Sequence, residues 1–215
     1  MNGMGYLTKI VVAQFGRPRG LLGRMAGLIM ARRASNRVRN LWTVDQLGLQ
    51  PKHCVLEVGF GPGLALAEVA KRVSHGQAVG LDHSEVMLRQ AARRNRLAIR
   101  NGLVRLVTGS VEDLANGSLR LGGPFDRIFG VNVSMFWKDR PAALRVLADL
   151  LADDGILALT HQPRLGDKTA EAVRRAADEL AADINAAGLS TEIRMFEGTS
   201  PPAVCVMGRR RRGDP

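Results

Sequence analysis

The stretch Val55-Leu56-Glu57-Val58-Gly59-Phe60-Gly61-Pro62-Gly63 sets the fold expected for this chain. A short apolar run, typical of a buried β-strand, leads into three glycines within five residues, and a helical pattern begins directly after them. Glycines between a strand and a helix let the backbone turn sharply, and they let a ligand approach more closely than a Cβ would permit. We therefore predict a ligand crevice at the carboxyl end of this strand, where open α/β sheets bind their ligands.

The rest of the chain alternates short apolar runs with longer helical patterns. The predicted strands cover residues 54–58, 78–81, 104–108, 127–131, 156–160, 192–196 and 203–207, and the predicted helices cover residues 64–73, 84–100 (with Ser84 as N-cap), 141–151 and 167–187. Such alternation requires a parallel sheet with helices on both faces. The short link between the last two runs permits a hairpin. The sequence thus predicts a doubly wound, mostly parallel, seven-stranded α/β sheet with an antiparallel last strand.

The net charge of +11 is concentrated at the two ends of the chain. Residues 1–52 contain nine Lys and Arg against Asp45 alone, residues 209–215 contain four Arg against Asp214, and residues 53–208 carry no net charge. Basic ends can steer acidic partners such as nucleic acid, anionic lipid or a phosphorylated substrate, and this effect weakens as salt rises. Alternatively, the basic ends bind no partner and only help to keep an Arg-rich protein soluble.

The length and composition disfavour several classes of protein. At 215 residues the chain is long enough for one full core, and it has no run of about eighteen uncharged apolar residues that could span a membrane. The N-terminus lacks the basic start, apolar stretch and cleavage site of a secretion signal. Cys54 and Cys205 lie in apolar strand-like runs, which fits buried thiols better than a disulfide framework or a metal site. We expect a cytoplasmic protein without a metal.

A nicotinamide or flavin dinucleotide site is the competing interpretation of the glycine loop, and the spacing disfavours it. That fingerprint needs glycines as G-x-G-x-x-G or A, whereas reading from Gly59 puts Leu64 in the third place, and reading from Gly61 puts Leu66 there. Glu57 would also bring a negative charge near the loop, which suits a cationic ligand better than a pyrophosphate.

Glu57-x-Gly59-x-Gly61-x-Gly63 resembles the first motif of the class I S-adenosylmethionine-dependent methyltransferases. Four further segments resemble later parts of that family in the same order, namely Gly80-Leu81-Asp82 and residues 109–114, 125–132 and 151–157. The resemblance covers roughly residues 50–165 and is closest to the quinone-biosynthesis and small-molecule branch. It implies the Rossmann-like methyltransferase fold and S-adenosyl-L-methionine as the methyl donor.

The resemblance also implies roles for individual residues. In the family, the acid and glycines of the first motif hold the methionine part of the cofactor, and the acid that ends the second strand accepts hydrogen bonds from the ribose hydroxyls. A carboxylate suits that task because it can accept from two vicinal hydroxyls at once. Ser110 stands where family members often have Asp. The complete set expected at the cofactor is Glu57, Gly59, Phe60, Gly61, Gly63, Asp82, His83, Met87, Ser110, Val111, Glu112 and Asn132.

The acceptor is expected near the ends of the fourth and fifth strands. His161 is the best-placed general base, because an unperturbed histidine titrates near neutrality. Asn132, the other catalytic candidate, ends the fourth strand. In family members this position contacts both the methionine part of the cofactor and the acceptor, although an Asn at the end of a strand can equally cap a turn. Phe136 and Trp137 either wall an apolar acceptor pocket or pack on the next helix. The residues expected to line the acceptor pocket are Met25, Ile29, Phe136, Trp137 and His161.

Methyl transfer from a sulfonium is an in-line displacement at carbon, in which alignment of the nucleophile and the methyl group supplies much of the catalysis. No covalent residue is required, and a base is needed only when the nucleophile must lose a proton. The chain lacks the Asn-Pro-Pro-aromatic segment that marks many family members acting on nucleobases or amide nitrogens. Val131-Asn132-Val133-Ser134 stands there instead, which favours a small-molecule or lipid acceptor, methylated at O, N or C, over nucleic acid.

Residues 1–50 are expected to form a helical lid segment, followed by a catalytic domain over residues 51–208 and a basic tail over residues 209–215. Apolar residues from Leu21 to Ile29 follow the spacing of an amphipathic helix, and a second helical pattern covers residues 41–47. The apolar face would close over the acceptor, with packing on the back of the sheet as the alternative.

Two other functions stay open at this stage. The same basic helix could lie on an anionic membrane, so that the enzyme methylates a lipid headgroup or a membrane-dissolved quinone. From a different class, the chain could be a non-catalytic protein of the same fold that binds the cofactor, or RNA through its basic ends. The sequence does not fix the oligomeric state, and a homodimer is one of the states it allows.

Overall fold

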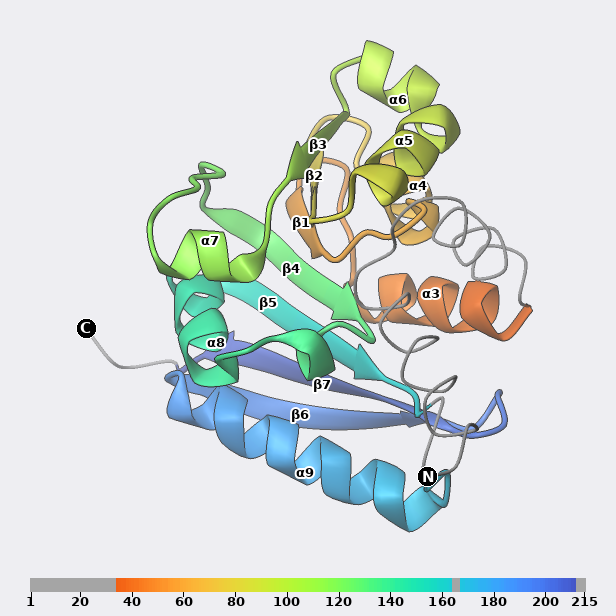
Figure 1. Cartoon of the computed structure of the whole chain (residues 1–215), viewed down its shortest axis with the longest axis vertical. Helices are drawn as coiled ribbons and strands as arrows, with labels where there is room; N and C mark the ends of the chain where they lie inside the picture. The colour runs from red at the N-terminus through yellow and green to blue at the C-terminus, as the bar shows by residue number, and fades with distance from the viewer. Residues whose placement is uncertain (1–33, 164–166, 212–215) are drawn as a thin grey trace, which may run out of the picture.

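The structure, a computed structural model, describes residues 34–163 and 167–211 (Figure 1). Its centre is a seven-stranded sheet with the strand order β3-β2-β1-β4-β5-β7-β6. The strands are β1 (Cys54–Val58), β2 (Gln77–Asp82), β3 (Val104–Thr108), β4 (Phe125–Val131), β5 (Leu151–His161), β6 (Leu189–Phe196) and β7 (Ala203–Arg210). The helices are α3 (Ala34–Gln46), α4 (Leu64–Arg72), α5 (Glu85–Arg94), α6 (Arg96–Arg100), α7 (Val111–Ala115), α8 (Arg140–Asp149) and α9 (Ala170–Ala186), with a short 3-10 turn, η1, at Ser134–Phe136.

The strand pairing confirms the predicted sheet. β3, β2, β1, β4 and β5 pair in parallel, and β7 runs antiparallel between β5 and β6, with which it forms the predicted hairpin. The chain winds outward from β1 to β3 and then returns to β4 on the other side of β1. The carboxyl ends of β1 and β4 therefore flank the point where the strand order reverses, which is where open α/β sheets hold ligands.

Helices cover both faces of the sheet (Figure 1). α8 packs on β5 and α9 on β5, β6 and β7, whereas α4 packs on β2, α5 on β2 and β3, and α3 on α4 and β5. Because successive strand residues point to opposite faces, two cores form. Along β1, Leu56 and Val58 join the core that contains α8 and α9, and Val55 joins the core that contains α3 and α4. Burial on both faces explains why these strands are continuous apolar runs.

Two predicted helices have different bounds in the structure. The predicted helix over residues 84–100 begins after Ser84, the expected N-cap, but Asn95 divides it into α5 and α6. The Asn95 side chain donates to the carbonyls of Ala91 at 2.9 Å and Gly63 at 3.1 Å, so the break is tied to the start of α4. The predicted helix over residues 141–151 ends early, because Leu151 already pairs with β4 in the first part of β5.

The boundary expected at residue 50 falls after a helix that belongs to the sheet domain. The pattern over residues 41–47 is the second half of α3, which begins at Ala34. Val44 and Leu47 are completely buried in the core beside α4. Residues 34–50 are therefore part of the packed domain rather than of a separate lid segment.

The C-terminal boundary also shifts. β7 continues through Arg210, so the first two arginines of the expected basic tail pair with neighbouring strands instead. The rest of the predicted lid, residues 1–33 with Met25 and Ile29, lies outside the described residues. Across residues 34–163 and 167–211, no helix is long and apolar enough to cross a membrane.

Candidate functional site

The glycine loop connects β1 to α4 and requires glycine at its first and last positions. Gly59 has a φ of 73°, and a Cβ there would collide with the side chain of Val133. Gly63 has a φ of 72°, and a Cβ there would lie 2.6 Å from Asn95 Nδ2 and 2.8 Å from Ala91 Cβ. The left-handed conformation and the close neighbours both exclude a side chain. The loop therefore lies tightly between the segment after β4 and helix α5.

Glu57 is the buried acid of the site. Its side chain is only 2% exposed, and its Oε2 atom has no hydrogen-bond partner among the described residues. Burial raises the pKa of Glu57 well above its ordinary value, the charge of Asp82 raises it further, and the backbone N–H of Leu66 opposes both effects. A buried carboxylate oxygen without a partner is costly. This position therefore favours a ligand that brings a positive charge or a hydrogen-bond donor.

Asp82 ends β2 and binds the glycine loop to the next helix. Its Oδ2 accepts the N–H of Gly61 at 2.8 Å, and its Oδ1 accepts the N–H of Ser84, the N-cap of α5, at 2.9 Å. Burial raises the pKa of Asp82, and the two backbone hydrogen bonds and the charge of His83 oppose that rise. Each carboxylate oxygen can accept more than one hydrogen bond, so Asp82 can serve the loop and ligand hydroxyls together.

Three further residues of the expected cofactor set lie around Asp82. Phe60 and Met87 are almost completely buried and belong to one small cluster with Ala91 of α5. Their side chains support the glycine loop from within the protein. His83 is exposed beside Asp82, so it is the one of these three whose side chain can reach a ligand in solvent.

The expected adenine-edge residues form a capped helix. Ser110 is the N-cap of α7, because its hydroxyl accepts the N–H of Asp113 at 3.2 Å and donates to Asp113 Oδ2 at 2.8 Å. Val111 is buried, and Glu112 Oε1 accepts the N–H of Lys138 at 3.1 Å. The polar side chains of this group therefore hold α7 and join it to the segment after β4.

Asn132 follows β4 with a φ of 55°, in the left-handed region that non-glycine residues rarely adopt. Its Nδ2 donates to the carbonyl of Gln162 at 3.0 Å, and its Oδ1 accepts the N–H of Gln162 at 2.7 Å. This reciprocal pair fastens the end of β4 to the residue after β5. Only the remaining donor and acceptor capacity of the Asn132 amide is left for a ligand.

Gln162 is a structural hub that the sequence analysis missed. Its Oε1 accepts a hydrogen bond from the Arg39 guanidinium of α3, and its Nε2 donates to Thr199 Oγ1 at 2.9 Å and to the carbonyl of Pro201 at 2.7 Å. Gln162 and Arg39 are both buried. The hub joins α3, the end of β4, the end of β5 and the connection between β6 and β7.

A second polar contact ties α3 to β5 beside this hub. Thr43 Oγ1 donates to Thr160 Oγ1 at 2.8 Å, and both residues are buried. The partners lie 117 positions apart in the chain. No local sequence pattern could indicate such a contact, which is why these threonines were not among the predicted site residues.

His161 is the last residue of β5 and stays half-buried. Burial lowers the pKa of His161 below its ordinary value, and the positive charge of Arg39 lowers it further. The imidazole is therefore neutral at neutral pH, which is the form that can accept a proton. The hydrogen bonds of Thr160 and Gln162 fix the backbone on both sides of it.

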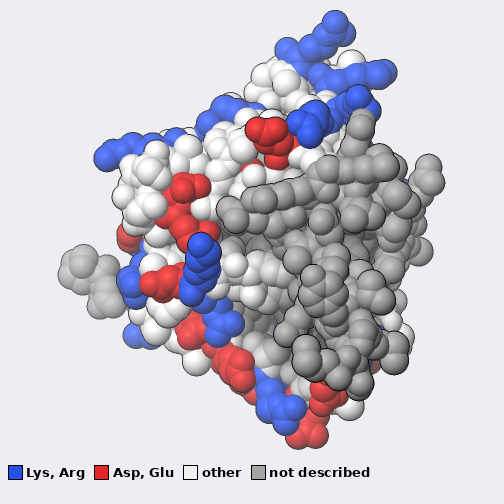
Figure 2. All heavy atoms as spheres, viewed as in Figure 1, with Lys and Arg blue, Asp and Glu red and all other residues white. Residues whose placement is uncertain are grey.

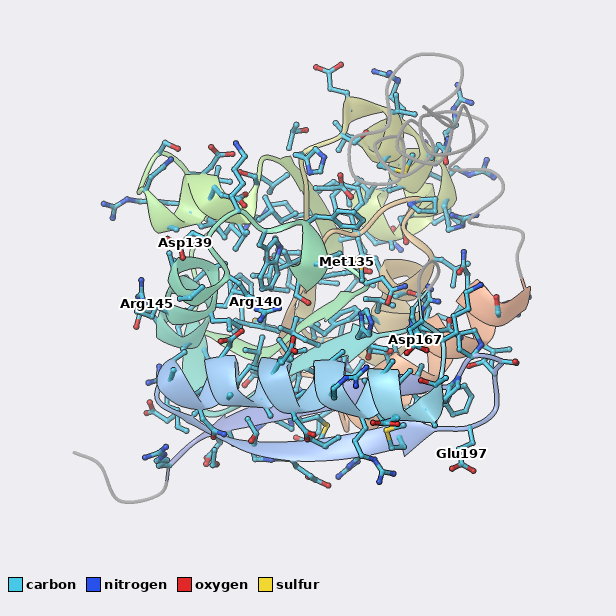
Figure 3. The ribbon with its side chains drawn as sticks, turned by 60° about the horizontal axis from the view of Figure 1, so that its bottom comes forward. Met135, Asp139, Arg140, Arg145, Asp167 and Glu197 are labelled. Atoms are coloured by element: carbon cyan, nitrogen blue, oxygen red, sulfur yellow. The ribbon has the colours of Figure 1, made fainter. Side chains whose placement is uncertain are left out.

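The residues after β4 divide between surface and core. Met135 and Phe136, in η1, are 46% and 42% exposed. Figure 3 labels Met135 together with Asp139, the N-cap of α8, and with Arg140 and Arg145 of that helix. Trp137 packs against the core that contains α8 and α9. Of the two aromatic residues expected at the acceptor pocket, Phe136 is thus available to a ligand, whereas Trp137 contributes to packing.

Comparison with known proteins identifies the family. Residues 55–155 match a family model described as a methyltransferase domain. The chain is 34% identical over 188 residues to the uncharacterized methyltransferase YdaC of Bacillus subtilis (strain 168), and this match covers 86% of the chain and 98% of the relative. The chain belongs to the class I S-adenosylmethionine-dependent methyltransferases. The resemblance found in the glycine loop is thereby confirmed.

Solved structures share the fold of this methyltransferase. A methyltransferase of Aquifex aeolicus, described as SAM-dependent, superposes with a TM-score of 0.61 at 19% identity, covering 79% of this chain and 88% of that one. The cyclase SpnF superposes with a TM-score of 0.66 at 16% identity, covering 83% of this chain and 82% of that one. These likenesses concern the fold, which carries more than one kind of chemistry.

The methyltransferase uses S-adenosyl-L-methionine, and the residues of the site fit this cofactor. The Oε2 of Glu57, which lacks a partner among the described residues, matches the ammonium group of the methionine part. Asp82 has acceptor capacity for the ribose hydroxyls beyond its two backbone bonds. Gly59 and Gly63, with positive φ values, let the loop that follows Glu57 turn sharply at the end of β1.

Proposed function

We propose that this methyltransferase transfers a methyl group from S-adenosyl-L-methionine to an O, N or C atom of a small-molecule acceptor by in-line displacement. The proposal rests on the position of His161, which is half-buried at the carboxyl end of β5, where burial lowers its pKa. Glu57 and Asp82 lie near the carboxyl ends of β1 and β2, in the same parallel part of the sheet. A base therefore lies at the edge of the sheet that holds the methyl donor.

The roles of the residues divide between holding the donor and accepting a proton. Glu57 binds the ammonium group and Asp82 the ribose hydroxyls, and the bound cofactor supplies the electrophilic methyl group. His161 accepts the proton of a hydroxyl acceptor at a ring nitrogen, whereas a neutral amine needs no base. Because alignment supplies much of the rate enhancement, the reciprocal bonds between Asn132 and Gln162 contribute by fixing the backbone beside His161.

The segment after β4 supports a small acceptor with an apolar part. Its sequence, Asn132-Val133-Ser134, lacks the prolines found in many family members that act on nucleobases or amide nitrogens. Met135 and Phe136 expose apolar surface directly after it. Pockets for small ligands combine such apolar walls with a few placed polar groups.

A panel of phenols, carboxylic acids and amines, each offered with methyl-labelled S-adenosyl-L-methionine, tests this proposal. We expect one class to be methylated with release of S-adenosylhomocysteine. With a hydroxyl acceptor, His161→Asn should lower kcat by about 10²–10⁴ while leaving S-adenosylhomocysteine affinity within a few-fold. His75→Asn, at an exposed histidine, is the matched control.

The pH profile provides a second measurement. The pKa of His161 lies below the ordinary 6.5, so its proton-accepting form is present throughout neutral pH and is lost only as the pH falls through that lowered value. Activity on a hydroxyl acceptor should therefore persist at neutral pH and decline on the acid side of 6.5. Binding of S-adenosylhomocysteine without methylation of any class in the panel would contradict the small-molecule proposal.

A further inference from the structure

Helices α5 and α6 carry a basic surface that is not apparent from the zero net charge of residues 53–208. Residues 86–111 contain six arginines and no acidic residue. The six, all exposed, are Arg89, Arg93, Arg94, Arg96, Arg100 and Arg105. Figure 2 shows Lys and Arg side chains gathered over the region of α5 and α6. Together with Leu97 and Ile99, the five arginines of α5 and α6 form what we call the α5–α6 face. Arg105 of β3 is not part of it, because its side chain leaves the other side of the sheet from Val104 and Leu106 and donates to the carbonyl of Leu121.

The tip of this face combines positive charge with exposed aliphatic side chains. α6 has the sequence Arg96-Leu97-Ala98-Ile99-Arg100, in which Leu97 is 62% and Ile99 36% exposed. Ala98 packs against the core beside α4. With about 100° between successive helical residues, Arg96 and Arg100 then lie on the outer side of α6, with the two aliphatic side chains flanking them.

Within the part of the chain that the structure describes, few acidic side chains compensate the charge of the face. Arg93, Arg96 and Arg100 form no ion pair with any residue in 34–163 or 167–211, and Arg89 has a single exposed partner, Glu85, at 3.4 Å. An exposed pair of this kind contributes little and is screened by salt. The face therefore presents its positive field to a partner outside the described chain.

We propose that the α5–α6 face binds the surface of an anionic phospholipid bilayer. Acidic headgroups would attract the arginines, and Leu97 and Ile99 would enter the boundary between headgroups and acyl chains. A basic face with exposed aliphatic residues at its tip has the composition of an interfacial membrane contact. This proposal goes beyond methyl transfer and does not depend on which acceptor the enzyme uses.

A bilayer fits the face better than nucleic acid does. Proteins that hold single strands combine basic grooves with aromatic rings on which bases stack. Residues 86–111 contain no Phe, Tyr or Trp. The side chains exposed among the arginines are aliphatic instead, and an aliphatic side chain gains from leaving water for lipid.

The face also adjoins the cofactor site. α5 begins at Ser84, whose N–H donates to Asp82, and Met87 of the same helix packs with Phe60 of the glycine loop. Arg94 donates to the carbonyl of Pro62 in that loop. Binding of the face to a bilayer would therefore bring the site of methyl transfer close to the membrane surface.

Co-sedimentation of the full-length protein with vesicles tests the proposal. The vesicles are phosphatidylcholine with or without phosphatidylglycerol, and the test variant carries Arg96→Glu and Arg100→Glu. The control variant carries Arg145→Glu and Arg174→Glu, at exposed positions on α8 and α9, so that both proteins have the same net charge and the same N-terminal segment. A third variant, Leu97→Ser, leaves the charge unchanged.

We expect the wild type to bind the phosphatidylglycerol vesicles and to be released as salt is raised. Each arginine near an anionic surface contributes about fivefold to binding, so the α6 double variant should bind more than tenfold more weakly, and the control should stay within a few-fold of wild type. Leu97→Ser should lose several-fold. All variants should keep the thermal shift given by S-adenosylhomocysteine, which separates this test from that of methyl transfer.

Three results would overturn the proposal. The first is equal binding of the α6 and control double variants, which would make any attraction a matter of net charge alone. The second is unchanged vesicle binding by Leu97→Ser, which would show that this side chain does not enter the bilayer. The third is binding of RNA that the α6 variant loses, with no sedimentation of the wild type with vesicles, which would assign the face to nucleic acid.

Discussion

Two buried carboxylates, Glu57 and Asp82, occupy the cofactor site, and burial is the main cause of the raised pKa at each. Asp82 is compensated by two backbone N–H groups, from Gly61 and Ser84. Glu57 keeps one oxygen without a partner among the described residues. Glu57 therefore offers an acceptor oxygen at the place where the cationic part of the cofactor is expected.

Glu57→Gln should change how stability depends on pH. In the wild type the pKa of Glu57 lies at its ordinary 4.5 in the unfolded chain and well above it in the folded protein. Between these values the folded protein retains a proton that the unfolded chain has released, so the free energy of unfolding falls as the pH rises through that window. The variant should lose this slope and melt higher than wild type at neutral pH.

The same variant should bind S-adenosylhomocysteine roughly ten- to hundredfold more weakly, because it loses a hydrogen bond to a charged group. Thermal unfolding across a pH series and calorimetric titration measure the two effects. Glu179→Gln, at an exposed acid on α9, is the matched control. Normal affinity for S-adenosylhomocysteine in Glu57→Gln would show that this acid does not face the ligand.

Asn132→Gly and Asn132→Ala separate the contribution of the Asn132 side-chain hydrogen bonds from that of its left-handed backbone conformation. Both remove the hydrogen bonds to Gln162, but only alanine places a Cβ on a backbone with a φ of 55°. The left-handed conformation costs a residue with a Cβ about 1 kcal/mol more than glycine. Urea unfolding should therefore rank wild type above the Gly variant and the Gly variant about 1 kcal/mol above the Ala variant. Equal stability of the two variants would mean that another conformation is adopted at this position.

The positions of Glu57, Asp82 and the glycines could be predicted from the sequence, because a strand, a turn and a helix follow one another there within a few residues. The burial of Arg39 could not be predicted. In the sequence it is one of several arginines in a helical pattern, and its hydrogen-bond partner, Gln162, lies 123 positions away. Whether an arginine is buried depends on such a partner, which only the folded chain supplies.

At the scale of elements, α3 shows how a helix before the first strand becomes part of the core. Val44 and Leu47 are completely buried, and Trp42 stacks on Phe196 of β6 with ring centroids 4.8 Å apart. The apolar pattern over residues 41–47 indicated a helix correctly. It could not indicate that the helix packs on the sheet, because an amphipathic pattern does not specify which surface it covers.

Deleting residues 1–33 and deleting residues 1–47 should therefore give different results. The shorter deletion leaves α3 in place, so folding and S-adenosylhomocysteine affinity should be preserved within a few-fold, and turnover should be lost if the deleted residues close over the acceptor. The longer deletion removes the buried side chains of α3 and that of Leu47 directly after it, and even Leu47→Ala alone should cost about 2–5 kcal/mol. Circular dichroism, thermal melts and ligand titration distinguish the two. A shorter deletion that abolishes folding would refute the lid.

The ends of several elements could not be predicted, for physical reasons that differ between them. α6 is separated from α5 by the bonds of the Asn95 side chain, and β5 starts at Leu151 because Phe125 of β4 pairs with it. Both causes include contacts between segments that are distant in the sequence, so no local pattern indicates them. α7 was missed although its capping box, Ser110 with Asp113 three positions later, is a local pattern that could have indicated it.

At the scale of the whole molecule, the candidate site draws on both halves of the sheet. Glu57 and Asp82 come from β1 and β2, whereas Asn132 and His161 come from the ends of β4 and β5, and the pairing of β1 with β4 joins the halves. Gln162 adds α3 and the connection between β6 and β7. A ligand held at this edge contacts residues whose positions depend on the fold of the entire domain.

S-adenosylhomocysteine should therefore raise the Tm of the whole domain in a single transition. A ligand that binds only the native state stabilises it by about 2.7 kcal/mol at a hundredfold excess over its Kd. NADH should give no shift, because Leu64 and Leu66 stand where a dinucleotide loop needs a small residue and Glu57 disfavours a pyrophosphate. Asp82→Asn, which loses the anionic acceptor for the ribose, should show a smaller shift than wild type at the same ligand concentration. Calorimetric melts with each ligand measure this directly, and a shift with NADH but none with S-adenosylhomocysteine would place a different cofactor in the loop.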